Sequence, residues 1–268
     1  EFHAFAATLE KDLAEINNIA PNTLNYMNLG GTAIGTGINT EYRYTQLAIQ
    51  ALSEISQKNI QSAPDLIVAT SDMGDFVLLS GLLKRTATKL SKIANDLRLL
   101  SSGPRTGINE INLEARQPGS SIMPGKVNPV IPEALNLVCF QIIANDLAVT
   151  LAAEAGQLQL NAMEPLIAFK LFESIELLSR ALVMFRTKCI DTVTANAEHC
   201  KAQVENSIGI VTALNPYLGY ETTTRIAKTA NESGLSVLSL IREEQLLSDE
   251  VIAEILAIDN MVKPKDAA

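Results

Sequence analysis

The stretch VIPEALNLVCFQIIANDLAVTLAAEA, residues 130–155, decides the fold of this chain. Its apolar residues cover nearly every face of a helix, over a length close to that of a transmembrane span. Polar residues nevertheless recur along it, at Asn136, Gln141, Asn145 and Asp146. Lipid would oppose the burial of these groups by a cost on the order of several kcal/mol. We therefore predict a helix in the interior of a helical bundle, with no membrane partner.

Long helices are also predicted on both sides of this stretch. Apolar residues at helical spacing indicate a helix over residues 64–100, which stops at the Ser-Ser-Gly-Pro run of residues 101–104. The same spacing indicates helices over residues 1–20, before Pro21, and over residues 165–190. The apolar residues are mainly Leu, Ile, Val and Ala, and aromatic residues make up 4%. This composition suits packed helices better than a β-sandwich.

Beyond residue 194 the long apolar helices give way to shorter, more charged helical patterns, with turns expected at Asn215-Pro216 and at Gly234. The predicted fold class is therefore all-α, a long-helix bundle followed by a small helical domain. We expect a central bundle domain over residues 1–197 and a C-terminal helical domain over residues 198–268. No internal repeat or clear β-hairpin signal occurs.

Charge and rare residues exclude several classes of function. The net charge of −9 argues against a nucleic-acid partner, since phosphate binding requires clustered Lys and Arg. The two histidines lie far apart in the sequence, so no histidine metal site is expected. Three cysteines (Cys139, Cys189, Cys200) lack CxxC spacing, which favours free thiols in a reducing cytoplasm. The glycine-rich run at residues 30–37 matches neither a P-loop nor a dinucleotide fingerprint, and we interpret it as a tight connector.

The segment GSSIMPGKVNP, residues 119–129, carries the candidate chemistry. Glycine-flanked Ser120 and Ser121 offer hydroxyls and accessible backbone N–H groups, as in an oxyanion hole. Lys126 adds a positive charge, and Asn128-Pro129 precedes a helix whose N-terminal N–H groups can face the same place. Together these groups attract a carboxylate or a developing negative charge.

Each residue of this segment also has a simpler structural interpretation. Asn128 could be only the N-cap of the following helix, with Pro129 in its first turn. Ser120 and Ser121 could be ordinary turn residues, and Lys126 a solvated lysine. The combination of all these residues within one short segment favours a site.

The whole segment resembles the signature of the fumarase/aspartase superfamily, whose members form fumarate by β-elimination. The resemblance extends over essentially all 268 residues, including residues 28–37 and 102–105. It implies that Ser120 is the general base, and that Ser121, Lys126 and Asn128 hold substrate carboxylates. Glu133 matches an acidic position that, in fumarases, partners a catalytic histidine.

A second segment distinguishes two branches of the superfamily. EAGQLQLN at residues 154–161 and Met163-Glu164-Pro165 look like aspartases, whereas class II fumarases typically have a Ser-Gly-Asn-Phe-Glu-Leu-Asn run. The resemblance thus implies reversible elimination of ammonia from L-aspartate to give fumarate, with no cofactor. A class II fumarase acting on malate and a non-catalytic helical assembly unit are the alternatives.

The resemblance also implies a homotetramer whose active site takes one segment from each of three subunits. Only one of these segments occurs here, and the chain begins at Glu1 already in helical periodicity. We therefore expect the C-terminal part of the family's chain, without its N-terminal domain and inactive alone.

Overall fold

The computed structural model describes residues 1–119, 122–123 and 125–262. The chain forms two compact units, Glu1–Thr194 and Ala195–Ala268. The division into domains over residues 1–197 and 198–268 stays a prediction.

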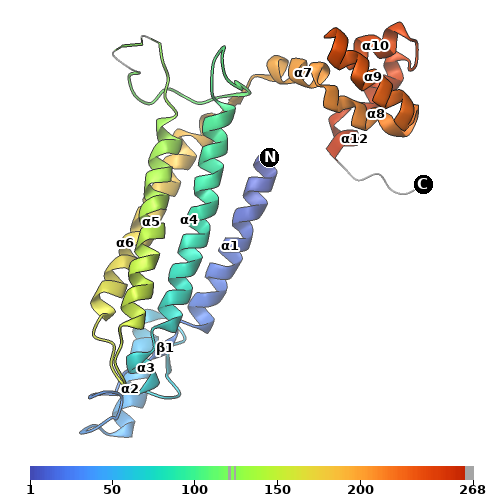
Figure 1. Cartoon of the computed structure of the whole chain (residues 1–268). Helices are drawn as coiled ribbons and strands as arrows, with labels where there is room; N and C mark the ends of the chain where they lie inside the picture. The colour runs from blue at the N-terminus through green and yellow to red at the C-terminus, as the bar shows by residue number, and fades with distance from the viewer. Residues whose placement is uncertain (120–121, 124, 263–268) are drawn as a thin grey trace. The chain divides into compact units, whose positions relative to one another are not determined.

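Four long helices build the first unit (Figure 1). They are α1 (Phe2–Asn22), α4 (Gly74–Leu100), α5 (Val130–Glu154) and α6 (Glu164–Lys188). Helix α4 packs against α1 and α5, and α5 packs against α6. The predicted all-α bundle is therefore confirmed, and the helices expected over residues 130–155 and 165–190 are present. The helix expected over residues 1–20 is also present, but it continues through Pro21 to Asn22.

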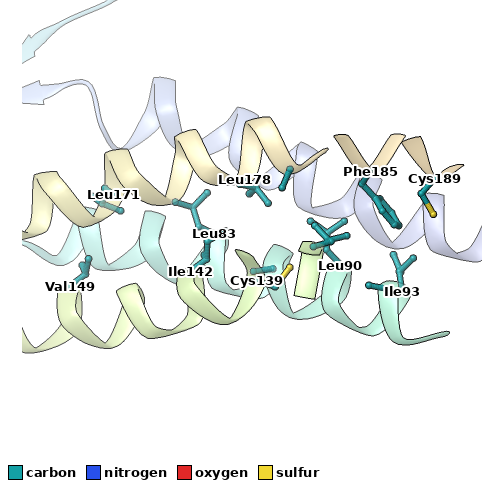
Figure 2. Packing of buried hydrophobic residues seen from close by; sticks show 14 of the residues in the cluster. Leu83, Leu90, Ile93, Cys139, Ile142, Val149, Leu171, Leu178, Phe185 and Cys189 are labelled. Carbon is teal, nitrogen blue, oxygen red and sulfur yellow. The ribbon is translucent and has the colours of Figure 1, made fainter. Parts of the chain in front are cut away.

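The core of the bundle follows from a repeat of apolar residues. Two helical turns span about seven residues, so side chains seven positions apart lie on one face. Figure 2 shows side chains from α4, α5 and α6 meeting between the helices. Buried apolar residues at this spacing are Leu83, Leu90 and Leu97 in α4, Leu135, Ile142 and Val149 in α5, and Leu171, Leu178 and Phe185 in α6.

Three of the four polar residues noted in α5 lie inside this bundle, whereas Gln141 is exposed. Asn136, Asn145 and Asp146 are buried. The Asp146 carboxylate accepts a hydrogen bond of 2.8 Å from Ser80 Oγ, and Asn145 Nδ2 donates to Ser174 Oγ at 3.1 Å. Among the described helices, α5 alone is long and apolar enough to cross a membrane, judged by length and composition. Its buried, paired polar groups agree with the predicted place inside a bundle.

Helix α4 begins at Gly74, so the predicted start at residue 64 is wrong. Carboxylates compete there with the helix for backbone N–H groups. Asp65 and Asp72 each accept a hydrogen bond from the N–H two residues further on, at 2.8 and 3.0 Å. These turns restrict the helical structure before α4 to the single turn of α3 (Val68–Ser71).

The end of the bundle at which α4 begins also holds α2 (Tyr42–Ser56), which the sequence analysis did not predict, and a parallel pair formed by β1 (Tyr26–Met27) and β2 (Gln61–Ser62) (Figure 1). The glycine-rich run is a tight connector, as predicted. A Cβ at Gly35 would lie 2.3 Å from the carbonyl oxygen of Leu66.

The second unit has a smaller core of its own, which includes Leu214, Ile226 and Ile241. The short 3-10 helix η1 (Ile190–Thr192) still belongs to the first unit. The helical elements of the second unit are α7 (Ala197–Asn206), η2 (Ile208–Ile210), α8 (Val211–Leu218), α9 (Tyr220–Ser233), α10 (Val237–Glu243), α11 (Asp249–Ile255) and α12 (Ile258–Val262).

The two turns expected in this unit had different outcomes. The turn at Asn215-Pro216 is wrong, because α8 continues through Pro216. Leu214 beside it is fully buried, and that packing outweighs the one hydrogen bond that proline removes. The turn at Gly234 is confirmed, since Gly234 ends α9 with φ 74°.

Candidate active site

The end of α4 forms one wall of the candidate site, because the following loop folds back onto it. Ser102 Oγ donates to the Leu99 carbonyl at 2.6 Å and accepts from the Ile108 N–H at 3.0 Å. The Glu110 N–H then donates to the Leu100 carbonyl at 2.9 Å. These bonds satisfy free carbonyls at the helix end and fix the loop against it. The strand β3 (Ile111–Asn112) follows, and Asn112 Nδ2 donates to Thr194 Oγ1, in β4 (Thr194–Ala195), at 3.2 Å.

The segment that carries the signature closes on itself at its base. A Cβ at Gly119 would lie 1.9 Å from the carbonyl oxygen of Lys126, so only glycine fits. The Lys126 N–H donates to the Met123 carbonyl at 3.2 Å, and Gly125 has a φ of +83° within this turn. The backbone of Gly119 therefore lies close to that of Lys126.

Helix α5 starts one residue later than it would if Asn128 were its N-cap. Its N-cap is Pro129, and no side chain caps it by a hydrogen bond. Asn128 is therefore not the N-cap, and its backbone carbonyl accepts from the Val130 N–H at 2.8 Å. Within the described part of the chain, the Asn128 side-chain amide therefore does not cap α5.

A cavity of about 440 Å³ lies between the end of α4 and the start of α5. Its polar lining residues are Arg98, Ser101, Ser102, Asn109, Asn112, Lys126 and Asn128. Among the described residues no Asp or Glu lines it. The cavity is thus locally positive within a chain of net charge −9, and its chemistry suits a carboxylate ligand.

The structure brings some of the predicted site residues together. Lys126 and Asn128 line the same cavity. Glu133 does not line it and lies half-buried in the first turn of α5. Ser120 and Ser121 lie outside the described residues, so their predicted roles stay predictions.

Arg98 lines this cavity but was missed by the sequence analysis. It lies in the last turn of α4, just before the Ser-Ser-Gly-Pro stop. A basic residue in the last helical turn usually offsets the helix dipole, so it carries no functional signal by itself. The only sequence signal for its position beside the loop is that it lies shortly before the Ser-Ser-Gly-Pro run that ends the helix.

Two other cavities lack the predicted residues. One of about 440 Å³ at the opposite end of the bundle includes Asp65, Asp72, Asp75 and Glu164 in its lining. Burial, together with the neighbouring charge of Asp72, raises the pKa of Asp75. This acidic lining would repel a dicarboxylate. Another cavity, of about 570 Å³, lies within the second unit and contains none of the signature residues.

Within the described part of the chain, no group of three or more His, Cys, Asp or Glu side chains could hold a metal ion. The residues of the cavity offer hydroxyl, amide and cationic groups instead. These groups bind anions by hydrogen bonds and charge.

Two family descriptions match the chain. Residues 1–144 match the family described as "Lyase", and residues 210–263 match "Fumarase C C-terminus". The first match covers more than half of the chain and includes the whole loop between α4 and α5.

Individual relatives agree with these matches. The chain is 66% identical to an aspartate ammonia-lyase of Pseudomonas aeruginosa over 265 residues, 99% of this chain and 56% of the relative. A fumarate lyase:delta crystallin structure from Brucella melitensis superposes with a TM-score of 0.93 at 51% identity, over 98% of this chain and 57% of that one. A class II fumarase from Schistosoma mansoni gives 0.88 at 32% identity, over 95% and 56%. The chain spans little more than half of each relative, and it belongs to the lyase family of the fumarase/aspartase superfamily.

Proposed function

We propose that this chain carries part of the active site of an aspartate ammonia-lyase, which eliminates ammonia from L-aspartate to give fumarate. The observation that carries the proposal is the 66% identity to the Pseudomonas aeruginosa aspartate ammonia-lyase over nearly the whole chain. The positive cavity lined by Lys126 and Asn128 supports it, because both substrate and product are dicarboxylates.

The proposed reaction begins with removal of the proton from Cβ of aspartate. Ser120, as an alkoxide, takes this proton, and the electron pair of the C–H bond moves into the adjacent carboxylate as an enediolate-like dianion. That pair then forms the carbon–carbon double bond while the C–N bond breaks. The ammonium group keeps the electron pair of the C–N bond and leaves as ammonia.

Lys126, Asn128 and Ser121 have the role of stabilising the dianion. Lys126 supplies charge, and Asn128 and Ser121 supply hydrogen-bond donors to substrate carboxylates. Preorganised donors of this kind act mainly on the transition state, and each contributes about 3–4 kcal/mol. We assign Glu133 to the positioning of a catalytic group supplied by another segment, since it lies outside the cavity.

The serine requires a large change in acidity. Lowering its pKa by about 5 units would take about 7 kcal/mol at about 1.4 kcal/mol per unit. Positive charge and loop N–H groups can supply this energy only where water is excluded. The active form is therefore a closed site.

A class II fumarase is the second candidate. The fold similarity to the Schistosoma mansoni class II fumarase supports it, at 32% identity. The 66% identity to an aspartate ammonia-lyase favours aspartate over malate.

We further propose a homotetramer in the cytoplasm, with domains over residues 1–197 and 198–268. Exposed apolar side chains along α5 and α6 support association, because monomers rarely leave such surfaces uncovered. They include Leu137, Phe140, Leu147, Leu151, Phe169 and Phe172. Three free cysteines, two of them buried, fit a reducing compartment.

The test uses this chain fused behind the portion of the Pseudomonas aeruginosa relative that it does not match. Fumarate formation at 240 nm is followed separately with saturating L-aspartate and with saturating L-malate. The proposal predicts turnover of aspartate at about 1–10³ s⁻¹ and no measurable dehydration of malate. Malate turnover at a comparable rate would establish the fumarase alternative. A well-folded fusion that converts neither substrate would support the non-catalytic assembly unit.

A further inference from the structure

Arg98 is a second cation in the cavity that Lys126 and Asn128 line. We propose that Arg98 is a specificity-determining positioning residue: its charge favours ligands with two carboxylates, and Asn136 and Ser91 fix where that charge lies. This inference rests on the proposed function and adds a residue to the same site.

Contacts on both sides of Asn136 hold the Arg98 guanidinium in place. Arg98 Nη1 donates to Asn136 Oδ1 at 3.2 Å, and the Asn136 side chain is 3% exposed. Asn136 Nδ2 donates to the Ser91 carbonyl at 3.1 Å and to Ser91 Oγ at 2.8 Å. A backbone carbonyl only accepts hydrogen bonds, so Ser91 determines that the Asn136 amide oxygen faces Arg98.

This arrangement links the two helices that border the cavity. Ser91 and Arg98 lie on α4, whereas Asn136 lies on α5, two turns beyond Asn128. Asn95 Oδ1 also accepts from Arg98 Nη1, at 3.2 Å. The guanidinium is therefore held in position through its Nη1 atom, which donates to both asparagine side chains.

The rest of the guanidinium is not used by the described residues. Its Nε and Nη2 groups make no hydrogen bond, and Arg98 forms no ion pair, within the described part of the chain. Arg85, by contrast, pairs with the buried Asp12 carboxylate at 2.7 Å. A charge that is held in place without a counter-ion beside an anion-binding cavity can act on a bound ligand.

The position of Arg98 at the end of a helix gives its charge a further effect. The last carbonyls of α4 present about half a negative charge at this end, which would repel carboxylates from the cavity. Arg98 offsets that charge. In a chain of net charge −9, Arg98 and Lys126 are the two cations among the described residues that line the cavity.

A charge effect and a purely structural effect predict different ligand dependence. The interaction of Arg98 with a ligand scales with ligand charge. Removing the Arg98 charge should therefore change the logarithm of the dissociation constant twice as much for a dianion as for a monoanion. A loss of cavity shape would weaken both ligands alike.

The test measures dissociation constants of succinate and butyrate by calorimetry, on the fusion protein described above. Arg98→Met should weaken the binding of succinate about tenfold, about 1.4 kcal/mol, and the binding of butyrate only about threefold. Arg98→Lys should retain most of the preference for succinate. Asn136→Ala keeps the Arg98 charge but removes the hydrogen bond that holds its guanidinium. The succinate dissociation constant of this variant should therefore lie between those of Arg98→Met and the parent. Arg180→Met removes an exposed charge on α6, outside the cavity lining, and should change neither ligand.

Each outcome decides a different claim. Equal weakening of succinate and butyrate in Arg98→Met, or no change in either, would overturn the role of Arg98 alone. A parent fusion that neither binds succinate nor converts aspartate would overturn the proposed function, and this inference with it. Unchanged thermal unfolding of Arg98→Met establishes that the binding results report the site.

Discussion

Gly119 lies in direct contact with the backbone of Lys126: a Cβ on Gly119 would be 1.9 Å from the Lys126 carbonyl oxygen. This contact brings the start of the signature segment close to Lys126, and it cannot survive any side chain at residue 119. We expect Gly119→Ala to displace Lys126 and lower kcat/KM by at least about a hundredfold, about 2.7 kcal/mol. The melting temperature should change little, because the segment lies outside the bundle core.

Gly81→Ala is the matched control for this variant. Gly81 lies within α4, and in the described part of the chain no atom beyond the neighbouring backbone of the helix lies within 4 Å of the position its Cβ would take. Alanine in a helix interior is favoured over glycine by about 1 kcal/mol, so this variant should be slightly more stable and fully active. Normal activity in Gly119→Ala would show that the contact does not position Lys126.

Replacing Lys126 by alanine should chiefly weaken substrate binding. Its charge faces a cavity without carboxylates among its described lining residues, so a dicarboxylate is its natural partner. We expect KM for aspartate to rise by at least about tenfold, about 1.4 kcal/mol, with kcat/KM falling further. Steady-state kinetics of the fusion protein measures both. An unchanged KM would support the interpretation of Lys126 as a solvated lysine.

The sequence predicted much of the fold because the deciding signals are local. The spacing of Leu135, Ile142 and Val149 and the recurrence of Asn136 and Asp146 are visible without coordinates. The predicted start of α4 was wrong because the turns before this helix depend on where two aspartate side chains point.

The candidate site was predictable only in part. Lys126 and Asn128 belong to one short segment, so their proximity follows from the chain itself. Arg98 is separated from them by a long loop and is held by Asn136 on another helix. No periodicity or motif encodes a contact between helices, and the role of Arg98 became visible only with the structure.

The buried carboxylate of Asp146 should contribute measurably to the stability of the bundle. It accepts hydrogen bonds from Ser80 and from Lys84, at 2.8 and 2.5 Å, and links α5 to α4. Asp146→Ala leaves the buried Ser80 hydroxyl without this acceptor. We expect a loss of about 2–3 kcal/mol in the free energy of unfolding, reduced from the usual range because Lys84 is half exposed.

Urea unfolding measures this loss, and Asp96→Ala serves as its control. Asp96 pairs with Lys92 on the surface of α4, where such pairs contribute at most about 1 kcal/mol. Equal losses in the two variants would contradict a specific role for the buried carboxylate.

Two buried thiols predict how stability depends on alkaline pH. Burial raises the pKa of Cys139 and of Cys189 from about 9 to about 11, with Arg116 partly opposing the shift at Cys189. The unfolded chain therefore loses these protons at lower pH than the folded chain, so stability falls as pH rises from about 9 to about 11. Each thiol contributes at most about 3 kcal/mol to this fall.

Urea unfolding under reducing conditions at pH 8 and pH 10.5 measures the effect. The difference between the parent and Cys139→Ala isolates one thiol from the lysines and tyrosines that titrate in the same range. A pH dependence identical in both proteins would show that the Cys139 thiol stays ordinary in the folded chain.

The most direct measurement of the proposed mechanism is the rate of fumarate formation from saturating L-aspartate by the Ser120→Ala fusion protein. A base used only in the chemical step should lower kcat by at least about a thousandfold, about 4 kcal/mol, when removed. The KM for aspartate should stay within about tenfold of the parent value, because Lys126 and Asn128 still hold the carboxylates. A kcat within tenfold of the parent would contradict the proposed mechanism, since Ser120 would then not be the base for β-elimination.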